Sequence, residues 1–353
     1  MPETQPLPAV AVIGAGAIGA AHARLMRRGN ACRLAAIADP SPAAAALAEE
    51  LGVPHLADYR ALLEGTPPDA VIVATPNQTH LPIGAAFLER GIPVLVEKPI
   101  ADTLEAARAL NEAAARHGTP LLVGHHRRHN PILKAASSAL AGGLIGELTT
   151  ASILASFLKH EGYFGLSWRR EAGGGPVLIN LIHEIDLVHY VCGEIASVQA
   201  VTSNARRGFA VEDSAVVLLR LVNGALVTLA LSDTVAAPWS WDLVSGESPN
   251  YPPVPAPVRT HFLGGTKGGL SLPDLGHWRY EGKAGWHEPL SYSSLAFAPA
   301  DPYEEQLRHL AQVARGLESP LCTGADAART LAATLAVHEA AGQGGTIVLD
   351  AQP

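Results

Sequence analysis

The sequence predicts an α/β protein of two domains, the first built on a doubly wound parallel sheet. The chain has 353 residues, more than one ordinary hydrophobic core encloses. Through residues 1–125, short continuous apolar segments alternate with segments of helical periodicity. A GxGxxG sequence follows the first apolar segment. This combination is typical of a parallel sheet covered by helices on both faces.

Each element of the first domain is bounded by its own local signal. Apolar, β-branched segments predict five strands, and segments with a helical repeat predict the four helices between them. Ser41 is the expected N-cap of the second helix, and Thr103 lies near the expected start of the fourth. The expected strands are 9–14, 33–40, 69–76, 93–99 and 120–125, and the expected helices are 16–29, 41–52, 79–91 and 103–118.

The turn after the first strand has the spacing of a dinucleotide-binding loop. Gly14 makes the tight turn, Gly16 lets the backbone approach a pyrophosphate, and Gly19 lets the helix pack closely on the strand. Ala17 and Ile18 open the helix whose N-terminus would face the phosphates. In this strand–turn–helix context the motif predicts a Rossmann domain, against the alternative of a glycine-rich turn in an unrelated α/β domain.

Asp39 ends the second strand, where a carboxylate can accept both ribose hydroxyls of NAD. The same charge repels the 2′-phosphate of NADP. The sequence therefore predicts NAD as the cofactor, with NADP as the alternative.

Motifs at later strand ends make the prediction more specific. The motifs are Thr75-Pro76-Asn77 with His80, Glu97-Lys98-Pro99, Gly124–Arg128, Gly173–Pro176 and His183. With the glycine loop, they resemble the Gfo/Idh/MocA family of glucose-fructose oxidoreductase and inositol 2-dehydrogenase, and the resemblance runs from about residue 8 to about residue 345.

The resemblance implies the architecture of the rest of the chain. Residues 126–353 would form an α+β domain with a large, open, mostly antiparallel sheet. That sheet would mediate homo-oligomer formation and wall the substrate site. Lys98 would lie beside the nicotinamide and the substrate oxygen, and the Lys98–Pro99 peptide would be cis. The other residues expected at the cofactor are Thr75, Pro76, Asn77, His80, Glu97 and Arg127.

Three of these residues have structural alternatives. Lys98 could be a solvated lysine at a strand end, which is the usual place of a lysine. Asn77 could serve only the turn after Pro76, and His80 could only start the next helix.

The segment 124–131 is rich in histidine and arginine. No cysteine or acidic residue lies nearby in the sequence, so we predict no metal site. Arg127 and Arg128 are expected to meet the cofactor, hold the domain interface or form structural salt bridges. His126 is a candidate for the substrate pocket.

The second domain shows mainly strand signals. Asn223-Gly224 between two apolar segments predicts a hairpin with a type I′ turn. Gly264–Gly269 resembles a phosphate loop in composition, but no helix follows, so we predict a hairpin turn. Residues 237–259 are expected to form a long ordered loop, and 302–318 and 325–344 two helices.

The segment 176–193 predicts a helix with a polar strip. Asn180 and His183 lie one turn apart on one face, and Asp186 lies a turn further on. Such a strip is costly to bury unless its groups pair with each other or bind a ligand. The resemblance places His183 beside the substrate hydroxyl. The alternative is a satisfied polar seam against the sheet.

The chain departs from the family at residue 179. Many members carry Asp four positions before the histidine, and this chain has Ile179. Asn180 cannot replace it, because an amide neither takes a proton nor holds an imidazolium by charge. The chemistry would then rest on Lys98 and His183 alone, or on another acid such as Glu184 or Asp186.

An aromatic group precedes the triple glycine. Tyr163, Phe164 and Trp168, with Lys159, are expected to shape the substrate pocket. For Trp168 the alternative is packing in the core.

These features predict NAD-dependent hydride transfer at a secondary hydroxyl or ketone. His183 would remove the hydroxyl proton and Lys98 would stabilise negative charge on the oxygen, or the two would exchange roles. By resemblance the substrate is a sugar, an inositol or a related cyclic polyol, with cyclic dihydrodiols next. The alternatives are a redox-neutral NAD-dependent glycosidase or epimerase and a non-catalytic sugar or NAD sensor.

Composition excludes other classes. The formal charge of −8 argues against nucleic acid as a partner, because phosphate binding needs a basic surface. No apolar segment is long enough to span a bilayer, and the N-terminus lacks the basic region of a signal peptide. Cys32, Cys192 and Cys322 form no CxxC pair and suit a reducing cytoplasm.

Overall fold

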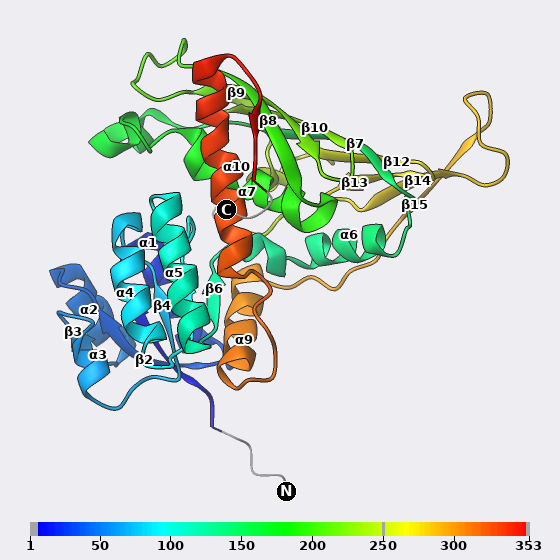
Figure 1. The fold of residues 1–353 in the computed structure, drawn as a ribbon. Coiled ribbons are helices and arrows are strands. Elements are labelled where there is room, and N and C mark those ends of the chain that lie inside the picture. Colours follow the sequence, from blue (N-terminus) through cyan, green and yellow to red (C-terminus); the bar gives the residue numbers. More distant parts are fainter. Residues whose placement is uncertain (1–5, 249–250, 351–353) are drawn as a thin grey trace, which may run out of the picture. The chain divides into compact units, whose positions relative to one another are not determined.

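The computed structural model describes residues 6–248 and 251–350, which form two compact units (Figure 1). The first unit comprises the chain up to His129 together with Ala300–Arg329, and the second comprises Asn130–Pro299 and the chain from Thr330 onward. The sequence predicts one boundary after residue 125. The structure instead returns the segment 300–329 to the first unit.

The first unit contains a six-stranded sheet of order β3-β2-β1-β4-β5-β6, with every pair parallel. This is the strand order of a Rossmann domain and confirms the predicted fold. The sequence misses β3 because two residues are too few to show a pattern. The strands are β1 Ala9–Ile13, β2 Arg33–Ala38, β3 His55–Leu56, β4 Ala70–Val73, β5 Val94–Val96 and β6 Leu121–Val123.

The predicted N-cap at Ser41 is confirmed, and Thr103 caps a second helix of this unit. The hydroxyl of Ser41 accepts a hydrogen bond from the backbone N–H of Ala44 (3.3 Å), and that of Thr103 accepts one from Ala106 (3.1 Å). The helices are α1 Ala17–Arg28, α2 Pro42–Leu51, α3 Ala61–Glu64, α4 His80–Leu88, α5 Leu104–His117 and α9 Pro302–Ala314, with 3₁₀ turns η1 Asn77–Thr79 and η2 His126–His129.

Helix α9 belongs to the first unit because its apolar face completes that core. Leu307, Leu310 and Ala311 are buried in the same cluster as Val10 and Ile72 of the sheet. The amphipathic repeat of this helix is visible in the sequence, but Val10 and Ile72 of the core that it covers lie more than 200 residues earlier in the chain, beyond the reach of a local pattern.

The second unit contains a ten-stranded sheet of order β15-β14-β13-β12-β7-β10-β9-β8-β16, with β11 paired to β7. Its described pairs are antiparallel except β7 with β10, which confirms the predicted large, mostly antiparallel sheet. The strands are β7 Leu148–Leu158, β8 Ile195–Ser203, β9 Ser214–Leu221, β10 Leu226–Ser232, β11 Thr234–Trp239, β12 His261–Gly265, β13 Gly269–Leu272, β14 Gly276–Tyr280, β15 Leu290–Ser294 and β16 Ile347–Val348.

The predicted hairpin of β9 and β10 is present, but the type I′ turn is wrong. Gly224 has a φ of 89°, whereas Asn223 is not among the described residues with positive φ. The backbone N–H of Gly224 donates to Leu221 (2.9 Å), and that of Leu221 donates to Ala225 (2.9 Å). This is a three-residue loop with glycine at the left-handed position. The Asn223 side chain caps the loop by accepting from Ala225 (3.1 Å).

The predicted hairpin turn at Gly264–Gly269 is confirmed, because it joins the antiparallel strands β12 and β13. The predicted long loop of 237–259 is shorter than expected. It includes the end of β11 and helix α8, Trp241–Val244, and residues 249–250 lie outside the described part.

The expected helix of 176–193 is divided into three parts. A π-helical turn, η5 Val177–Leu181, leads into α7 Ile182–Leu187, and a second π-helical turn, η6 Val188–Cys192, ends at Gly193. Wider turns of this kind are common at functional sites. The other helices of this unit are α6 Pro131–Ala141 and α10 Gly324–Gln343, of which the part from Thr330 onward belongs to this unit. The unit also contains the 3₁₀ turns η3 Glu161–Gly165 and η4 Ser167–Arg170.

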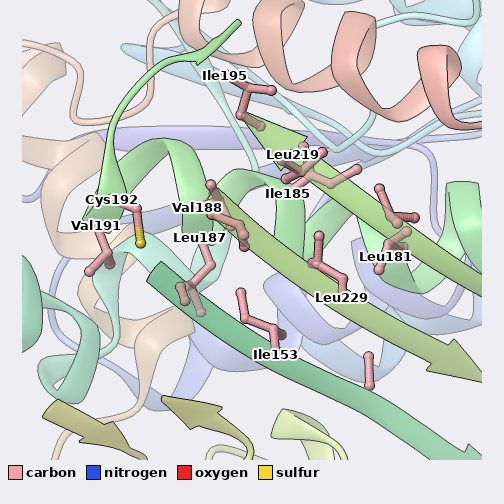
Figure 2. Close-up of a cluster of buried hydrophobic side chains, with 14 of the residues drawn as sticks. Ile153, Leu181, Ile185, Leu187, Val188, Val191, Cys192, Ile195, Leu219 and Leu229 are labelled. Carbon is pink, nitrogen blue, oxygen red and sulfur yellow. The ribbon is translucent and has the colours of Figure 1, made fainter. Parts of the chain in front are cut away.

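The core of the second unit lies between one face of its sheet and the helices α6, α7 and α10. Figure 2 shows Leu181, Ile185 and Val188 pointing toward Leu219 and Leu229 of the sheet. This packing fixes the helix that carries Asn180 and His183. Within the described part of the chain, no helix combines the length and apolar character needed to cross a membrane.

We expect Val188→Ala to lower the free energy of unfolding by about 2–3 kcal/mol, from the lost burial of two methyl groups and the cavity left behind. The matched control is Val222→Ala, because Val222 is 71% exposed whereas Val188 is fully buried. Urea unfolding followed by circular dichroism measures both. Equal destabilisation by the two variants would contradict the packing described here.

Candidate cofactor and substrate sites

The glycine loop has the geometry of an anion-binding turn. Gly14 has a φ of 88°, and a Cβ there would lie 2.6 Å from the Ala74 carbonyl oxygen. A Cβ at Gly19 would overlap the Gly14 carbonyl oxygen, so α1 could not approach the strand. A Cβ at Gly16 would meet nothing within 4 Å. The loop is therefore closed against the sheet at Gly14 and Gly19 and open at Gly16.

The start of α1 is available to a phosphate group. Gly16 is the N-cap and provides no side chain to satisfy the first N–H groups of the helix, which include those of Ala17 and Ile18. These donors and the positive end of the helix dipole suit a pyrophosphate.

Asp39 borders this loop at the end of β2. Its carboxylate accepts hydrogen bonds from the backbone N–H groups of Ala15 and Ser41, both at 2.8 Å. Burial alone would raise the pKa of Asp39, but these hydrogen bonds hold it below its ordinary value. The ionised carboxylate has lone pairs left for ribose hydroxyls, so loop and acid together fit NAD.

Three loops of the first unit meet at one edge of its sheet. The strands β1, β4 and β5 are adjacent and parallel, so their carboxyl ends lie side by side. Gly14 follows β1, Asn77 follows β4, and Lys98 follows β5. Asn77 and Lys98 are both partly exposed. The structure thus brings together the glycine loop, Thr75-Pro76-Asn77 and Glu97-Lys98-Pro99.

The Lys98–Pro99 peptide is cis, as the resemblance implies. His80 connects this turn to the end of β4, because its ring nitrogens lie 3.0 Å from the Pro99 carbonyl oxygen and 2.9 Å from the Thr75 carbonyl oxygen. Burial lowers the pKa of His80, so the neutral ring donates to one carbonyl at a time. His80 is only 1% exposed, so it lies inside the unit rather than at an open surface.

Glu97 is also buried and does not line an open surface. Its carboxylate lies 2.8 Å from Nε2 of His22 on α1, and a Cβ at Gly124 would lie 2.8 Å from the same carboxylate. Burial would raise the pKa of Glu97, but the hydrogen bond and charge of His22 lead the effects that hold it below its ordinary value. Sequence reasoning missed His22, which carries no motif signal of its own within an ordinary amphipathic helix.

The histidine- and arginine-rich segment is buried. His126 stacks on Tyr303 of α9, with ring centroids 4.3 Å apart. The guanidinium of Arg128 lies 3.6 Å from the Asp326 carboxylate, so Arg128 forms a structural salt bridge, one of the roles expected for it from the sequence. Arg127 is 3% exposed. In the part of the chain that the structure describes, no group of three His, Cys, Asp or Glu side chains is arranged to hold a metal ion.

In the second unit, the helix keeps Asn180 and His183 accessible. Both are partly exposed, while Leu181 and Ile182 between them are fully buried, as expected if the two polar residues share a face. Ile179 is partly exposed as well.

The two acids that could have replaced the missing aspartate have structural partners. Glu184 is 2% exposed, and its carboxylate lies 2.8 Å from Nε2 of His261 in β12. Asp186 is also 2% exposed and accepts a hydrogen bond from the Thr330 hydroxyl (3.1 Å). Neither carboxylate is exposed beside His183.

Asn180 is instead held by a buried lysine. Nζ of Lys159 donates to Oδ1 of Asn180 (2.8 Å) and lies 3.5 Å from the Asp233 carboxylate. Burial lowers the pKa of Lys159, against the opposing charge of Asp233. Lys159 and Asp233 meet because they follow β7 and β10, the parallel pair of this sheet. The sequence shows Asp233 only as a residue after a strand, so its role could not be predicted.

Lys159, Asn180 and Asp233 form a lysine cluster, and Tyr163 lies against it. Trp168 is joined to Tyr163 through Arg169, whose Cζ is 5.3 Å from the centre of the Trp168 ring. Nζ of Lys159 is 4.6 Å from the centre of the Tyr163 ring, and Cζ of Arg169 is 4.0 Å from it. Trp168 is 49% exposed, so the alternative that it packs in the core is wrong. Sequence reasoning did not single out Arg169, although it directly follows Trp168.

Models of known protein families match the sequence of both units. The model for an oxidoreductase family with an NAD-binding Rossmann fold matches residues 9–125, and that for the GFO/IDH/MocA C-terminal domain matches residues 133–270. The chain belongs to the GFO/IDH/MocA family. Its first unit is therefore an NAD-binding Rossmann domain, and NAD is its cofactor.

Within this family, the chain is 30% identical over 305 residues to 1,5-anhydro-D-fructose reductase of Ensifer adhaerens, covering 85% of the chain and 86% of the relative. It is 32% identical over 236 residues to inositol 2-dehydrogenase 2 of Saccharopolyspora erythraea, covering 63% of the chain and 66% of the relative. The chain spans only about half to two thirds of the length of the first curated relatives that it matches.

Solved structures with the same fold are known. An oxidoreductase from Agrobacterium radiobacter, in complex with NAD⁺, L-tartaric acid and magnesium, superposes with a TM-score of 0.79 at 21% identity. The superposition covers 97% of this chain and 98% of the other. At this identity the likeness establishes the architecture of the chain.

We expect Asp39→Asn to weaken NAD⁺ binding by about tenfold or more, because it removes a charged acceptor at the ribose position. NADP⁺ binding should not weaken in parallel, since the repulsion of a 2′-phosphate is lost too. Isothermal titration calorimetry measures both affinities. The control is Asp58→Asn, an exposed carboxylate paired with Arg60. Equal NAD⁺ affinity in the two variants would contradict the assignment of Asp39.

Proposed function

We propose that the protein is an NAD(H)-dependent dehydrogenase or reductase acting on a secondary hydroxyl or ketone of a sugar, an inositol or a related cyclic polyol. The observation that carries the proposal is the placement of Lys98 on the Glu97-Lys98-Pro99 turn, at the same sheet edge as the glycine loop. Ligands of open α/β sheets bind at this edge. The relatives named as inositol 2-dehydrogenase and anhydrofructose reductase support the substrate class.

Lys98 and His183 are the proposed catalytic residues. Bound NAD⁺ supplies the hydride acceptor at C4 of its nicotinamide ring. In the oxidising direction, His183 accepts the proton of the substrate hydroxyl while the C–H hydrogen leaves as hydride, so the alcohol becomes a ketone. Lys98 donates a hydrogen bond to the same oxygen and stabilises its developing negative charge. The two residues exchange roles if their protonation states are reversed.

Other residues would position the Lys98 turn or contact the substrate. His80 connects the Lys98 turn to β4, and the buried pair of His22 and Glu97 supports the same turn from inside the unit. Tyr163, Trp168 and Asn180 are the proposed substrate contacts of the second unit. His126 is less suited to that role, because it is only 8% exposed and stacks on Tyr303.

We expect Lys98→Met and His183→Ala each to lower kcat by about 100- to 10,000-fold, the usual contribution of a positioned proton-transfer or oxyanion-stabilising group. Absorbance of NADH is followed with NAD⁺ and a panel of polyols, inositols and aldoses. Lys283→Met is the control, since Lys283 is exposed and lies outside the proposed site.

Two other results would redirect the proposal. Bound NAD⁺ without release of NADH, together with conversion of a glycoside or sugar epimer, would identify a redox-neutral enzyme. Binding of NAD⁺ and a sugar without turnover, and with no effect of Lys98→Met on either, would identify a sensor.

We also propose that the protein forms a homo-oligomer through the outer face of the second unit's sheet. Residues alternate along β9, so Val217 and Leu219 face the core while Val216 and Leu218 are 57% and 48% exposed. Exposed apolar residues continue across neighbouring strands of this face, which is unusual for a surface that stays in water. They include Val201, Leu226, Phe262, Trp278 and Tyr292.

We expect the double substitution Val216→Glu and Leu218→Glu to reduce the oligomer to a smaller species, because burying two carboxylates against an apolar partner surface is costly. Light scattering coupled to size-exclusion chromatography gives the molar mass. The control substitutes Val222→Glu, an exposed valine in the hairpin loop. A wild-type mass of one chain would overturn the proposal.

The three cysteines are reduced and buried in the structure, and burial raises the pKa of the Cys32 and Cys192 thiols to about 12. Unreactive thiols of this kind are compatible with the reducing cytoplasm that we propose as the compartment.

A further inference from the structure

The accessible side of the lysine cluster offers hydrogen-bond donors. Nζ of Lys159 donates to Oδ1 of Asn180 at 2.8 Å, and this bond fixes which end of the amide faces the lysine. The Nδ2 group, which carries two N–H donors, is then turned away from Lys159. Among the described residues it has no hydrogen-bond partner. Asn180 therefore presents donors on the face that it shares with His183.

Arg169 adds further donors and a charge without a counter-ion. Its guanidinium stacks on Tyr163 and donates from Nη1 to the Tyr163 carbonyl oxygen (2.7 Å). Its Nε is buried and has no partner among the described residues, none of which brings a carboxylate within 4.0 Å of the guanidinium. The residue as a whole is partly exposed, so an anion from solvent can reach this charge. The planar guanidinium fork matches a carboxylate.

The nearby carboxylates are already engaged. Asp233 is shared between Lys159 (3.5 Å) and Arg207 (3.1 Å). Glu161 lies 3.5 Å from Arg207, and its side chain is 92% exposed. Asp213 accepts hydrogen bonds from the backbone N–H groups of Arg206 and Arg207, both at 2.9 Å. These acids neutralise the Arg207 side of the cluster, and no carboxylate of the described residues pairs with Arg169.

A substrate hydroxyl and a substrate carboxylate make different demands on such a surface. A hydroxyl donates as well as accepts, so it is best recognised where the protein also provides an acceptor. The neighbouring residue, Ile179, has no polar side chain to accept a hydrogen bond, and Oδ1 of Asn180 is occupied by Lys159. A carboxylate only accepts, and charged hydrogen bonds to it are stronger than neutral ones.

We propose that Arg169, Lys159 and Nδ2 of Asn180 form a subsite for a carboxylate group of the substrate. The substrate is then an acidic sugar or polyol of the uronic or aldonic acid class rather than a neutral polyol. This inference rests on the proposed function for its redox chemistry, but the subsite lies within the second unit and can be tested by binding alone.

The experiment compares sugar acids with their neutral counterparts on the full-length protein saturated with NAD⁺. The pairs are D-glucuronate and D-glucose, D-galacturonate and D-galactose, and D-gluconate and D-glucitol. Affinities are measured by isothermal titration calorimetry, and the same samples are assayed for NADH absorbance. We expect at least one acid to bind about tenfold or more tightly than its neutral partner, and this preference to shrink with added salt.

Substitutions at neighbouring arginines separate the subsite from the general charge of the protein. Arg169→Gln should remove most of the preference for the acid, and Arg169→Lys should retain part of it, since the charge remains but the fork is lost. Arg170→Gln makes the same change of charge one residue away at an exposed position and should leave the preference unchanged. Thermal unfolding of each variant checks that it is folded.

The outcomes distinguish this inference from the proposed function. If no acid binds more tightly than its neutral partner, or if Arg169→Gln and Arg170→Gln have equal effects, the subsite is overturned. Reduction of NAD⁺ by a neutral polyol in that case would leave the proposed function standing. If an acid binds through Arg169 but no compound of the panel reduces NAD⁺, the subsite stands and the proposed redox function is the part in doubt.

Discussion

Parallel pairing of neighbouring strands is the constraint on which both candidate sites depend. In the first unit, β1, β4 and β5 run parallel, so the glycine loop, Asn77 and Lys98 emerge at one edge. In the second unit, β7 and β10 form the parallel pair of a mostly antiparallel sheet, and Lys159 and Asp233 emerge together from them. Antiparallel pairing would have sent each pair of loops to opposite edges.

Behind the accessible groups, each unit holds a buried pair of histidine and glutamate. His22 lies 2.8 Å from Glu97 beneath the Lys98 turn, and His261 lies 2.8 Å from Glu184 next to His183 in the chain. In both cases a buried carboxylate is satisfied by an imidazole rather than exposed to solvent. These pairs fix the backbone on either side of the proposed catalytic residues and take no direct part in the chemistry that we propose.

The sequence predicted elements whose cause is local and missed those whose cause is distant. The cap at Ser41, the start of α5 near Thr103 and the hairpin of β9 and β10 follow from a few adjacent residues. The hairpin's turn type did not follow, because Asn-Gly also fits a three-residue loop in which only glycine has positive φ. The return of α9 to the first unit depends on a core assembled from the other end of the chain.

By itself, the sequence determined the Rossmann fold, the place of its glycine loop and Asp39, and the motifs that mark the family. Those features are written in contiguous residues whose spacing is set by strand and helix geometry. Only the tertiary structure decided which acids are engaged. It pairs Glu184 with His261 and Asp186 with Thr330, and it brings Lys159 to Asn180. These partners are 21 to 144 residues apart in the chain, so only folding brings them within hydrogen-bonding distance.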